Sequence, residues 1–326
     1  MASAEHVRIV LQGVAAVEAW RDQHPYEHLD LDNADLAAAQ LSGMSLTAAR
    51  LRDADLRDAD LSASDLASAQ LHGARLTGAD LRKARLCGAN LTEADLCAAN
   101  CTRAQLNAAD LSWARLIDAK LCEANLSQCD LINADLSEAD LSDADLQQAE
   151  LINATLDRAN LAGATLRGAT LINAKLVGAN LADCNLVEAR LIDANLTDAN
   201  LARAVLSEAD VSSLQHADLS QADLADASLV DSDLSESNLT DANLRDADLR
   251  GANLRGANLT RTDLAESNMV GVALDRAQVE SADWLQKLLE LPAPPTGIQQ
   301  ILKQYSVESR LDQHGDVRFI LQFRRQ

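Results

Sequence analysis

Aromatic residues are scarce in this chain. They make up 2% of its 326 residues, as three Trp, two Tyr and two Phe. An ordinary globular core of this size uses many more aromatic side chains, because each of them buries a large apolar area. The chain is nevertheless 48% hydrophobic, with Leu and Ala abundant. This bias predicts a repeat array instead of a single globular core.

Long apolar runs and paired cysteines are also missing. No run is long enough to span a bilayer, so we expect no membrane contact. The first residues, MASAEHVRIVLQG, show no basic segment followed by a long apolar stretch, and we therefore expect a cytoplasmic protein without a secretion signal. The six Cys residues have neither the spacing of a disulfide framework nor that of a zinc site, and we expect free thiols.

A period of five residues dominates the sequence. In LINADLSEADLSDADL (131–146) Leu recurs at every fifth position, and Ala often stands two residues before it. An apolar residue continues this series from Leu31 to Val211, and again from Leu219 to Val279, for 37 and 13 repeats. Helices repeat near 3.6 residues and strands near 2, so neither fits. We expect Leu and Ala to line a narrow interior and stacked coils to bury a continuous Leu column.

These tandem runs resemble the pentapeptide-repeat family. Examples are ADLRDADLSASDL (54–66) and ANLRDADLRGANLRGANL (242–259), and the match covers roughly residues 31–283. The resemblance implies an all-β solenoid, namely a right-handed quadrilateral β-helix with four repeats per coil. Fifty repeats would then make about twelve coils and a rod about 60 Å long, at roughly 4.8 Å per coil.

The two ends depart from the period, which divides the chain into segments 1–30, 31–283 and 284–326. Residues 4–23 have apolar side chains at helical spacing and predict an N-terminal capping helix, with Trp20 and Tyr26 packed against it. The apolar positions of this helix are Val7, Val10, Leu11, Val14 and Val17.

The C-terminal segment predicts helical and hairpin elements. WLQKLLEL (284–291) reads as a short helix ended by PAPP (292–295), and GIQQILKQY (297–305) as a second one. Two extended arms around His314-Gly315 predict a hairpin. Two interpretations stay open for this segment. It caps the solenoid, or it joins two copies into a homodimer, as the resemblance implies for topoisomerase-binding members of the family.

The period breaks between Val211 and Leu219, which are eight residues apart. We expect three extra residues at one corner, within 212–218, forming a small surface loop. The resemblance also allows a functional loop, because loops of this kind take part in the activity of relatives that protect DNA gyrase.

Residues 20 positions apart should stack on one face, and this reading reveals an apolar column. Ile occurs at four positions 20 residues apart, each directly after a central Leu. Asn or Asp follows each Ile and forms a second column, and Trp113 lies one coil before the first Asn of that column. The Ile residues would form an outward ladder about 15 Å long. The column either improves packing between neighbouring coils or contacts a partner. We call this set the apolar ladder: Trp113, Ile132, Ile152, Ile172 and Ile192.

The array is strongly acidic, with 41 Asp and Glu against 20 Lys and Arg in residues 31–283. Between Ser207 and Asp248, eleven acidic residues face one basic residue, Arg245. This charge either keeps the protein soluble or imitates DNA, which carries roughly 35 charges per 60 Å. We call the following set the acidic stretch: Asp218, Asp223, Asp226, Asp231, Asp233, Glu236 and Asp241.

Catalytic motifs are absent from the sequence. GANLRGAN (251–258) belongs to the repeat and not to a phosphate-binding loop, and the six His residues are scattered. We therefore expect no enzyme, no cofactor and no metal site. We expect a protein-interaction scaffold that uses the apolar ladder and the acidic faces, without direct nucleic-acid binding. The alternative, implied by the resemblance, is a DNA mimic that binds DNA gyrase or another type II topoisomerase.

Overall fold

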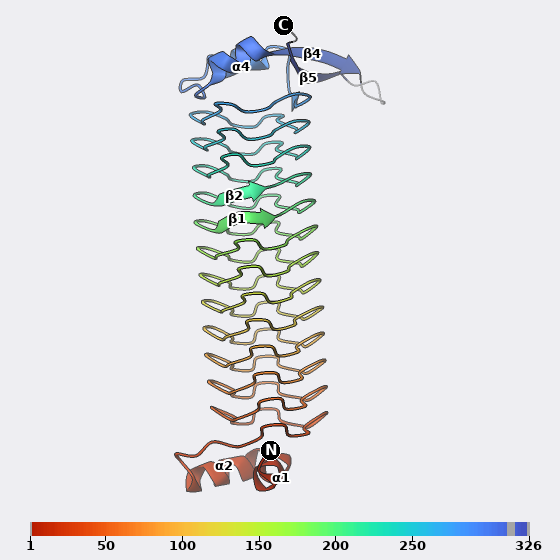
Figure 1. Cartoon of the computed structure of the whole chain (residues 1–326), viewed down its shortest axis with the longest axis vertical. Coiled ribbons are helices and arrows are strands. Elements are labelled where there is room, and N and C mark those ends of the chain that lie inside the picture. The colour runs from red at the N-terminus through yellow and green to blue at the C-terminus, as the bar shows by residue number, and fades with distance from the viewer. Residues whose placement is uncertain (1, 312–316, 325–326) are drawn as a thin grey trace. The chain divides into compact units, whose positions relative to one another are not determined.

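The structure is a computed structural model that describes residues 2–311 and 317–324. The chain forms two compact units, Met1–Thr170 and Leu171–Gln326. Both units consist mainly of the same kind of coil (Figure 1).

The five-residue repeat forms one side of a four-sided coil. Parallel bridges join residues 20 positions apart, such as Arg50 and Gln70, so four repeats complete one coil. In the repeat that starts at Leu51, the Ala54 N–H donates to the Leu51 carbonyl at 3.2 Å and closes a turn. The Leu51 N–H donates to the Gln70 carbonyl of the next coil at 2.8 Å. These parallel ladders confirm the predicted β-helix.

The second residue after each Leu forms a corner with left-handed backbone. Asp53 and Asp58, for example, have φ of 55° and 57°. Gly, Asn and Asp adopt such values most readily, and they fill many of the corners. The Asp or Asn before each Leu supports the same turn, as Asp60 does when its Oδ1 accepts the Ser62 N–H at 3.0 Å. The preference for Ala-(Asp/Asn)-Leu therefore has a local cause.

Leu and Ala side chains fill the interior of both units. The central Leu residues are no more than 1% exposed, and Met44, Cys101 and Cys129 are fully buried in the same interior. Each coil covers its neighbour, so every repeat buries its apolar residues against two others. The coils thus build their interior without aromatic side chains, as the composition predicts.

Two helices precede the first coil of the N-terminal unit. α1 spans Ala4–Leu11 and α2 spans Val14–Gln23. Gly13 separates them with φ of 100°, a conformation that continues no helix. The structure therefore corrects the single helix predicted over residues 4–23.

The second helix is held against the coil by one basic side chain. Arg21 donates to the carbonyls of Ser45 and Thr47 at 2.9 and 2.8 Å. Trp20 is buried as predicted, but Tyr26 is 95% exposed, so its predicted packing is wrong. Tyr26 lies three residues after the end of α2 at Gln23.

The period break in the C-terminal unit is a deletion and not an insertion. Leu214, only three residues after Val211, is fully buried and takes the next central position. Bridges in this region join residues 18 positions apart, as between Asn200 and Asp218, so the coil is two residues shorter. The prediction of three extra residues and a loop at 212–218 is wrong, because Leu214 is itself a repeat centre.

The deletion removes one corner. β1 (Arg190–Asn195) and β2 (Asp210–Ser213) pair in parallel at this point (Figure 1). Among the described residues between Glu208 and His216, none has positive φ. The chain therefore runs straight where every regular repeat turns.

Two helices and a small sheet follow the last coil of the C-terminal unit. α3 spans Trp284–Leu289, α4 spans Ile298–Gln304, and β4 (Tyr305–Leu311) pairs antiparallel with β5 (Val317–Phe323). β5 also pairs antiparallel with β3 (Gln278–Val279) at the end of the array. The predicted turn at His314-Gly315 lies outside the described residues.

The C-terminal elements pack on the end of the array. Trp284 and Tyr305 are buried, and Leu321 is fully buried. The Leu274 N–H donates to the Tyr305 hydroxyl at 3.1 Å. These contacts join the C-terminal elements to the last repeats of the array.

Candidate interaction surfaces

The N-terminal unit holds three members of the apolar ladder. Ile132 and Ile152 are half-buried, while Trp113 is 62% exposed. Trp113 lies at a corner with φ of 63°, in the column of Asn133, and its N–H donates to the Ile132 carbonyl at 2.9 Å. The Trp side chain therefore flanks the Ile column and does not form a rung of it.

The C-terminal unit holds the other two members and extends the column past the deletion. Ile172 and Ile192 are half-buried. Leu191 pairs with Val211, whose N–H donates to the Ser228 carbonyl at 3.1 Å, so the column of Ile192 leads toward Val230. The sequence reading missed this extension, because it counted steps of 20 through a coil that has 18 residues.

Two Val residues stand on this extended face. Val230 and Val270 are 39% and 42% exposed, which is unusual for Val in this chain. Arg250 lies between them in the same column and pairs with Asp248 at 2.6 Å. Counting the repeats again from Leu214 would have revealed both Val residues from the sequence alone.

Three members of the acidic stretch serve the fold. Asp218, Asp223 and Asp233 each precede a buried Leu and are half-buried. The Oδ1 atom of each accepts the N–H two residues later at 3.0–3.2 Å. The same atom accepts the side-chain amide of an Asn in the next coil at 2.8–2.9 Å. These carboxylates hold turns and coils together, which leaves them less available to a partner.

The other four members of the acidic stretch stand at exposed corners. Asp226, Asp231, Glu236 and Asp241 have φ between 56° and 60°. Arg261 donates to Asp241 at 2.6 Å, and this hydrogen bond lowers the pKa of the Asp241 carboxyl below its usual value. Asp241 thus stays ionised, and Arg261 of the next coil offsets its negative charge.

Gly residues in the next coil make room for two of these corner carboxylates. A Cβ added to Gly251 would meet Asp231 Oδ1 at 2.1 Å, and one added to Gly256 would meet Glu236 Oε1 at 2.3 Å. The acidic side chains therefore lie over the following corner.

One corner column of the C-terminal unit is acidic in five successive coils, because the Glu188 N–H donates to the Ser207 carbonyl at 3.1 Å and so places Glu188 before Glu208. Asp226 and Asp246 donate their N–H groups to the Arg245 and Ala265 carbonyls of the coils that follow, both at 3.1 Å. The bridge between Asp210 and Ser228 places Glu208 beside Asp226 in the same way. Glu266, the last member of this column, pairs with Arg245 at 2.9 Å. We call this column the acidic ridge: Glu188, Glu208, Asp226, Asp246 and Glu266.

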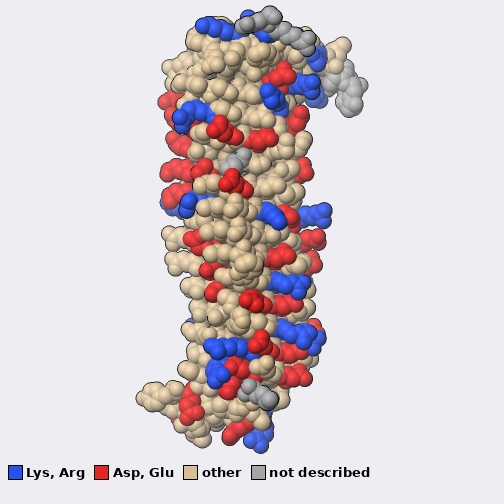
Figure 2. Space-filling view, in the orientation of Figure 1, with Lys and Arg blue, Asp and Glu red and all other residues tan. Residues whose placement is uncertain are grey.

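Basic side chains are interspersed among the acidic ones elsewhere on the visible face of each unit (Figure 2). Several Arg residues bind a carboxylate one coil away, as Arg203 binds Asp183 and Arg85 binds Asp65. Exposed ion pairs of this kind add little stability each. They do break up the negative field, so among the described corners only the ridge keeps a run of more than two acidic residues.

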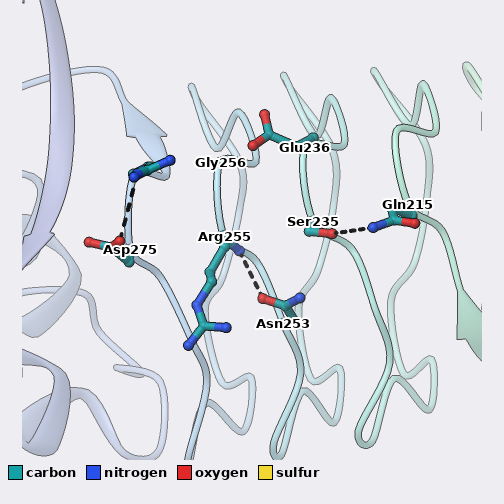
Figure 3. Close-up of a pocket in the computed structure, with 8 residues that line it drawn as sticks. Gln215, Ser235, Glu236, Asn253, Arg255, Gly256 and Asp275 are labelled. Atoms are coloured by element: carbon teal, nitrogen blue, oxygen red, sulfur yellow. Dashed lines mark hydrogen bonds and ion pairs between the residues drawn. The ribbon is translucent and has the colours of Figure 1, made fainter.

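A shallow hollow of about 480 Å³ lies on the side of the C-terminal unit (Figure 3). Gln215 Nε2 donates to Ser235 Oγ of the neighbouring coil at 3.1 Å. Glu236, Arg255 and Gly256 also line the hollow, and the Glu236 carboxylate lies over Gly256. Its lining is polar and of both signs, unlike the largely apolar walls of small-molecule sites.

Among residues 2–311 and 317–324, no group of three or more His, Cys, Asp and Glu could hold a metal ion. No helix in that part of the chain is both long and apolar enough to cross a membrane. All six Cys residues are free thiols.

Comparison with known proteins identifies the repeat. HetL from the cyanobacterium Nostoc sp. strain PCC 7120, a pentapeptide-repeat protein involved in heterocyst differentiation regulation, is 30% identical over 81% of this chain and 96% of its own, with a TM-score of 0.21. QnrB1, a plasmid-mediated fluoroquinolone resistance protein, is 20% identical over 68% of this chain and 96% of its own, with a TM-score of 0.30. No curated protein matches. The family model for pentapeptide repeats matches eight times, at residues 30–66, 45–82, 74–112, 109–148, 144–183, 184–213, 212–241 and 242–278.

Proposed function

The chain belongs to the pentapeptide-repeat family, and from this we propose that it is a non-enzymatic scaffold that binds another protein through the apolar ladder and its acidic faces. A fold does not determine a function, so the proposal depends on the surfaces. The interior is filled with Leu and Ala, which leaves no cavity for a substrate along the coils. We expect no cofactor for the same reason.

One observation carries the scaffold proposal. In the C-terminal unit, apolar side chains stay on the face of Ile172 and Ile192 although the two-residue deletion shifts the sequence period. Val230 and Val270 stand on that face and are exposed by about two fifths. Aligned exposed apolar side chains usually mark a contact with another protein.

Trp113 gives the N-terminal unit its own candidate contact. Trp is enriched among the residues that contribute most to binding at protein interfaces. Its side chain is 62% exposed beside Ile132, at a turn that needs no aromatic residue.

The scaffold is tested by binding assays with charge substitutions in each unit. Ile172→Asp with Ile192→Asp should abolish partner binding through the C-terminal half of the apolar ladder. Ala182→Asp with Ala202→Asp is the matched control, because it adds the same charge at the same repeat position on another side. Binding through apolar contact should persist at high salt, where electrostatic attraction is screened. Equal loss in both variants, or loss in neither, would contradict the proposal.

The same test applies to the N-terminal unit. Trp113→Ala combined with Ile132→Asp should remove that contact and leave binding through the C-terminal unit intact. Circular dichroism should show unchanged coils in both variants, because all substituted side chains lie outside the interior.

The acidic ridge favours a second candidate function, a DNA mimic that binds DNA gyrase or another type II topoisomerase. Five acidic corners in successive coils form a line of negative charge, as a phosphate backbone does. The interspersed Arg residues and the structural use of Asp218, Asp223 and Asp233 weigh against it. These features limit the mimicry to part of one unit.

A gyrase supercoiling assay at low and moderate salt tests the mimic. Inhibition, or protection from a quinolone, should fade as salt rises. Glu208→Gln, Asp226→Asn and Asp246→Asn together should abolish the effect. Asp218→Asn, Asp223→Asn and Asp233→Asn remove the same charge from the coil sides and should preserve most of it. No effect of the unmodified protein on gyrase would exclude this function.

We propose right-handed winding, about twelve coils, and end elements that act as caps. We also propose a cytoplasmic location, supported by six free thiols, because oxidising compartments favour disulfides. The C-terminal element 284–326 would also join two copies of the chain.

A further inference from the structure

The small C-terminal sheet has a free edge, on which no other described strand pairs. Its strand order is β3-β5-β4, so β5 is central and β4 bonds to β5 on one side. From Glu308 to Leu311 the strand is exposed. A free edge presents unpaired N–H and C=O groups to any strand that can approach it. Proteins often protect such edges with Lys, Pro or bulges, and the sequence of β4, YSVESRL, contains neither Lys nor Pro.

The backbone groups at this edge can be identified from the pairing of β4 and β5. The Arg324 N–H donates to the Gln304 carbonyl at 2.7 Å, next to the Tyr305–Phe323 pair. In antiparallel pairs, the residues that bond to the neighbour alternate with residues whose backbone points away. Ser306, Glu308 and Arg310 therefore bond to β5. Val307, Ser309 and Leu311 direct their N–H and C=O groups to the free edge.

We propose that β4 pairs antiparallel with β4 of a second copy of this chain, about a two-fold axis at Ser309. This deepens the proposed C-terminal self-association, on which it rests, by naming the strand and its register. A two-fold interface uses the same surface on both copies, so it requires a self-complementary strand. The outward groups of Val307, Ser309 and Leu311 would supply about six backbone hydrogen bonds across the axis.

The side chains of β4 have that self-complementarity. With Ser309 on the axis, Glu308 lies opposite the partner's Arg310, and Arg310 lies opposite the partner's Glu308. In the single chain Arg310 and Glu308 pair with each other at 3.4 Å, and both are about half exposed. Opposite charges directly across an antiparallel pair stabilise it. Any shift of the strand by two residues would lose this match.

The apolar side chains match in the same register. Val307 lies opposite the partner's Leu311, on the sheet face that also carries Val317 and Phe319. Leu311 is 72% exposed and Val317 is 57% exposed, the most exposed aliphatic positions of the hairpin. A second β4 would cover Leu311 with an apolar side chain and remove it from water.

Charge exchange tests the register. The full-length protein should sediment at twice its monomer mass of 34.8 kDa in analytical ultracentrifugation. Glu308→Arg places Arg opposite the partner's Arg310 at both ends of the interface and should weaken dimerisation at least about tenfold, and Arg310→Glu should do the same with Glu opposite Glu. Mixing the two variants should restore a dimer, because each supplies the charge that the other lacks. The double variant, Glu308→Arg with Arg310→Glu, should dimerise by itself.

Ser309→Pro provides a second test that spares the monomer. Its lost N–H points to the free edge and makes no bond to β5, so the hairpin should fold and the dimer should not form. If both single charge variants and Ser309→Pro still form dimers, this interface is refuted, while C-terminal self-association is left in place. A wild-type monomer at the highest soluble concentration would refute both. Neither result would bear on the apolar ladder, which lies elsewhere in the chain.

Discussion

The Ser232 side chain packs where the deletion removes a corner. Its hydroxyl should contribute more to the free energy of unfolding than any other hydroxyl of the coils. In a regular repeat the Leu carbonyl accepts the N–H three residues later. At the deletion this residue is Leu214, whose N–H donates instead to the Asp233 carbonyl at 2.8 Å. The Ser232 hydroxyl, which is fully buried, donates to the Val211 carbonyl from the next coil. Ser232 thus replaces the turn bond that the shortened repeat lacks.

The cost of Ser232→Ala follows from what the Val211 carbonyl loses. Leaving a buried acceptor without its donor costs about 1–3 kcal/mol. Ser237 is the matched control, because it occupies the same repeat position and is equally buried. Its hydroxyl donates to the Leu234 carbonyl at 2.7 Å, but that carbonyl also accepts the Ser237 N–H at 3.2 Å. Ser237→Ala should therefore change the free energy of unfolding by less than about 0.5 kcal/mol.

Denaturant unfolding of the two variants measures the difference, and amide hydrogen exchange locates it. Ser232→Ala should lower the unfolding midpoint and speed exchange around β1 and β2, and Ser237→Ala should do neither. Equal effects of the two substitutions would refute the reasoning, because the two sites differ mainly in the alternative donor. Exchange that accelerates evenly along the C-terminal unit would also refute it.

Three further predictions concern other parts of the chain. Gly251→Ala should lower the free energy of unfolding by about 1 kcal/mol, because this corner has positive φ. Gly43→Ala is the control and should lower it equally, since its corner also has positive φ but no atom lies near the added Cβ. At Gly251 the Asp231 carboxylate has to rotate away, which a crystal structure would show, and a much larger loss of stability than at Gly43 would contradict the prediction. Arg21→Ala removes two hydrogen bonds to backbone carbonyls and should speed hydrogen exchange in α2 without affecting the C-terminal unit; unchanged exchange in α2 would show that the helix is held by apolar contacts alone. Burial, and next a hydrogen bond to a neighbouring carboxylate, raise the pKa of Cys97 to about 11. The thiolate is the reactive form, so alkylation at pH 8 should be roughly a hundredfold slower than for an ordinary thiol and should accelerate as pH rises toward 11; rapid labelling at pH 8, measured by peptide mass spectrometry, would contradict this.

Much of the fold was predictable because each repeat is a local unit. The Ala-(Asp/Asn)-Leu order indicated buried Leu, buried Ala and a polar turn, and the structure has all three at Leu51, Ala54 and Asp60. The C-terminal helices and hairpin followed from apolar spacing and from Pro. The N-terminal helix was predicted too long, because apolar spacing alone does not show that the backbone turns at Gly13.

The surfaces were predicted less well, because they depend on which residues stack between coils. The seven residues of the acidic stretch share a charge and a region of sequence, but Asp233 holds an Asn of the next coil while Asp226 stands on the ridge. Ile192 and Val230 share a face only because a coil of 18 residues lies between them. Reading Leu214 as a repeat centre would have corrected that count.

The sequence by itself determined the five-residue period, the Leu and Ala interior, and the corners where the backbone must turn. These features depend on residues within one repeat, and each repeat contains its own turn chemistry. Only the tertiary structure decided that the break is a deletion, that Ser232 replaces its lost hydrogen bond, and which charges line one column. Those features depend on the register between coils, which is set by backbone bonds between residues about 20 positions apart.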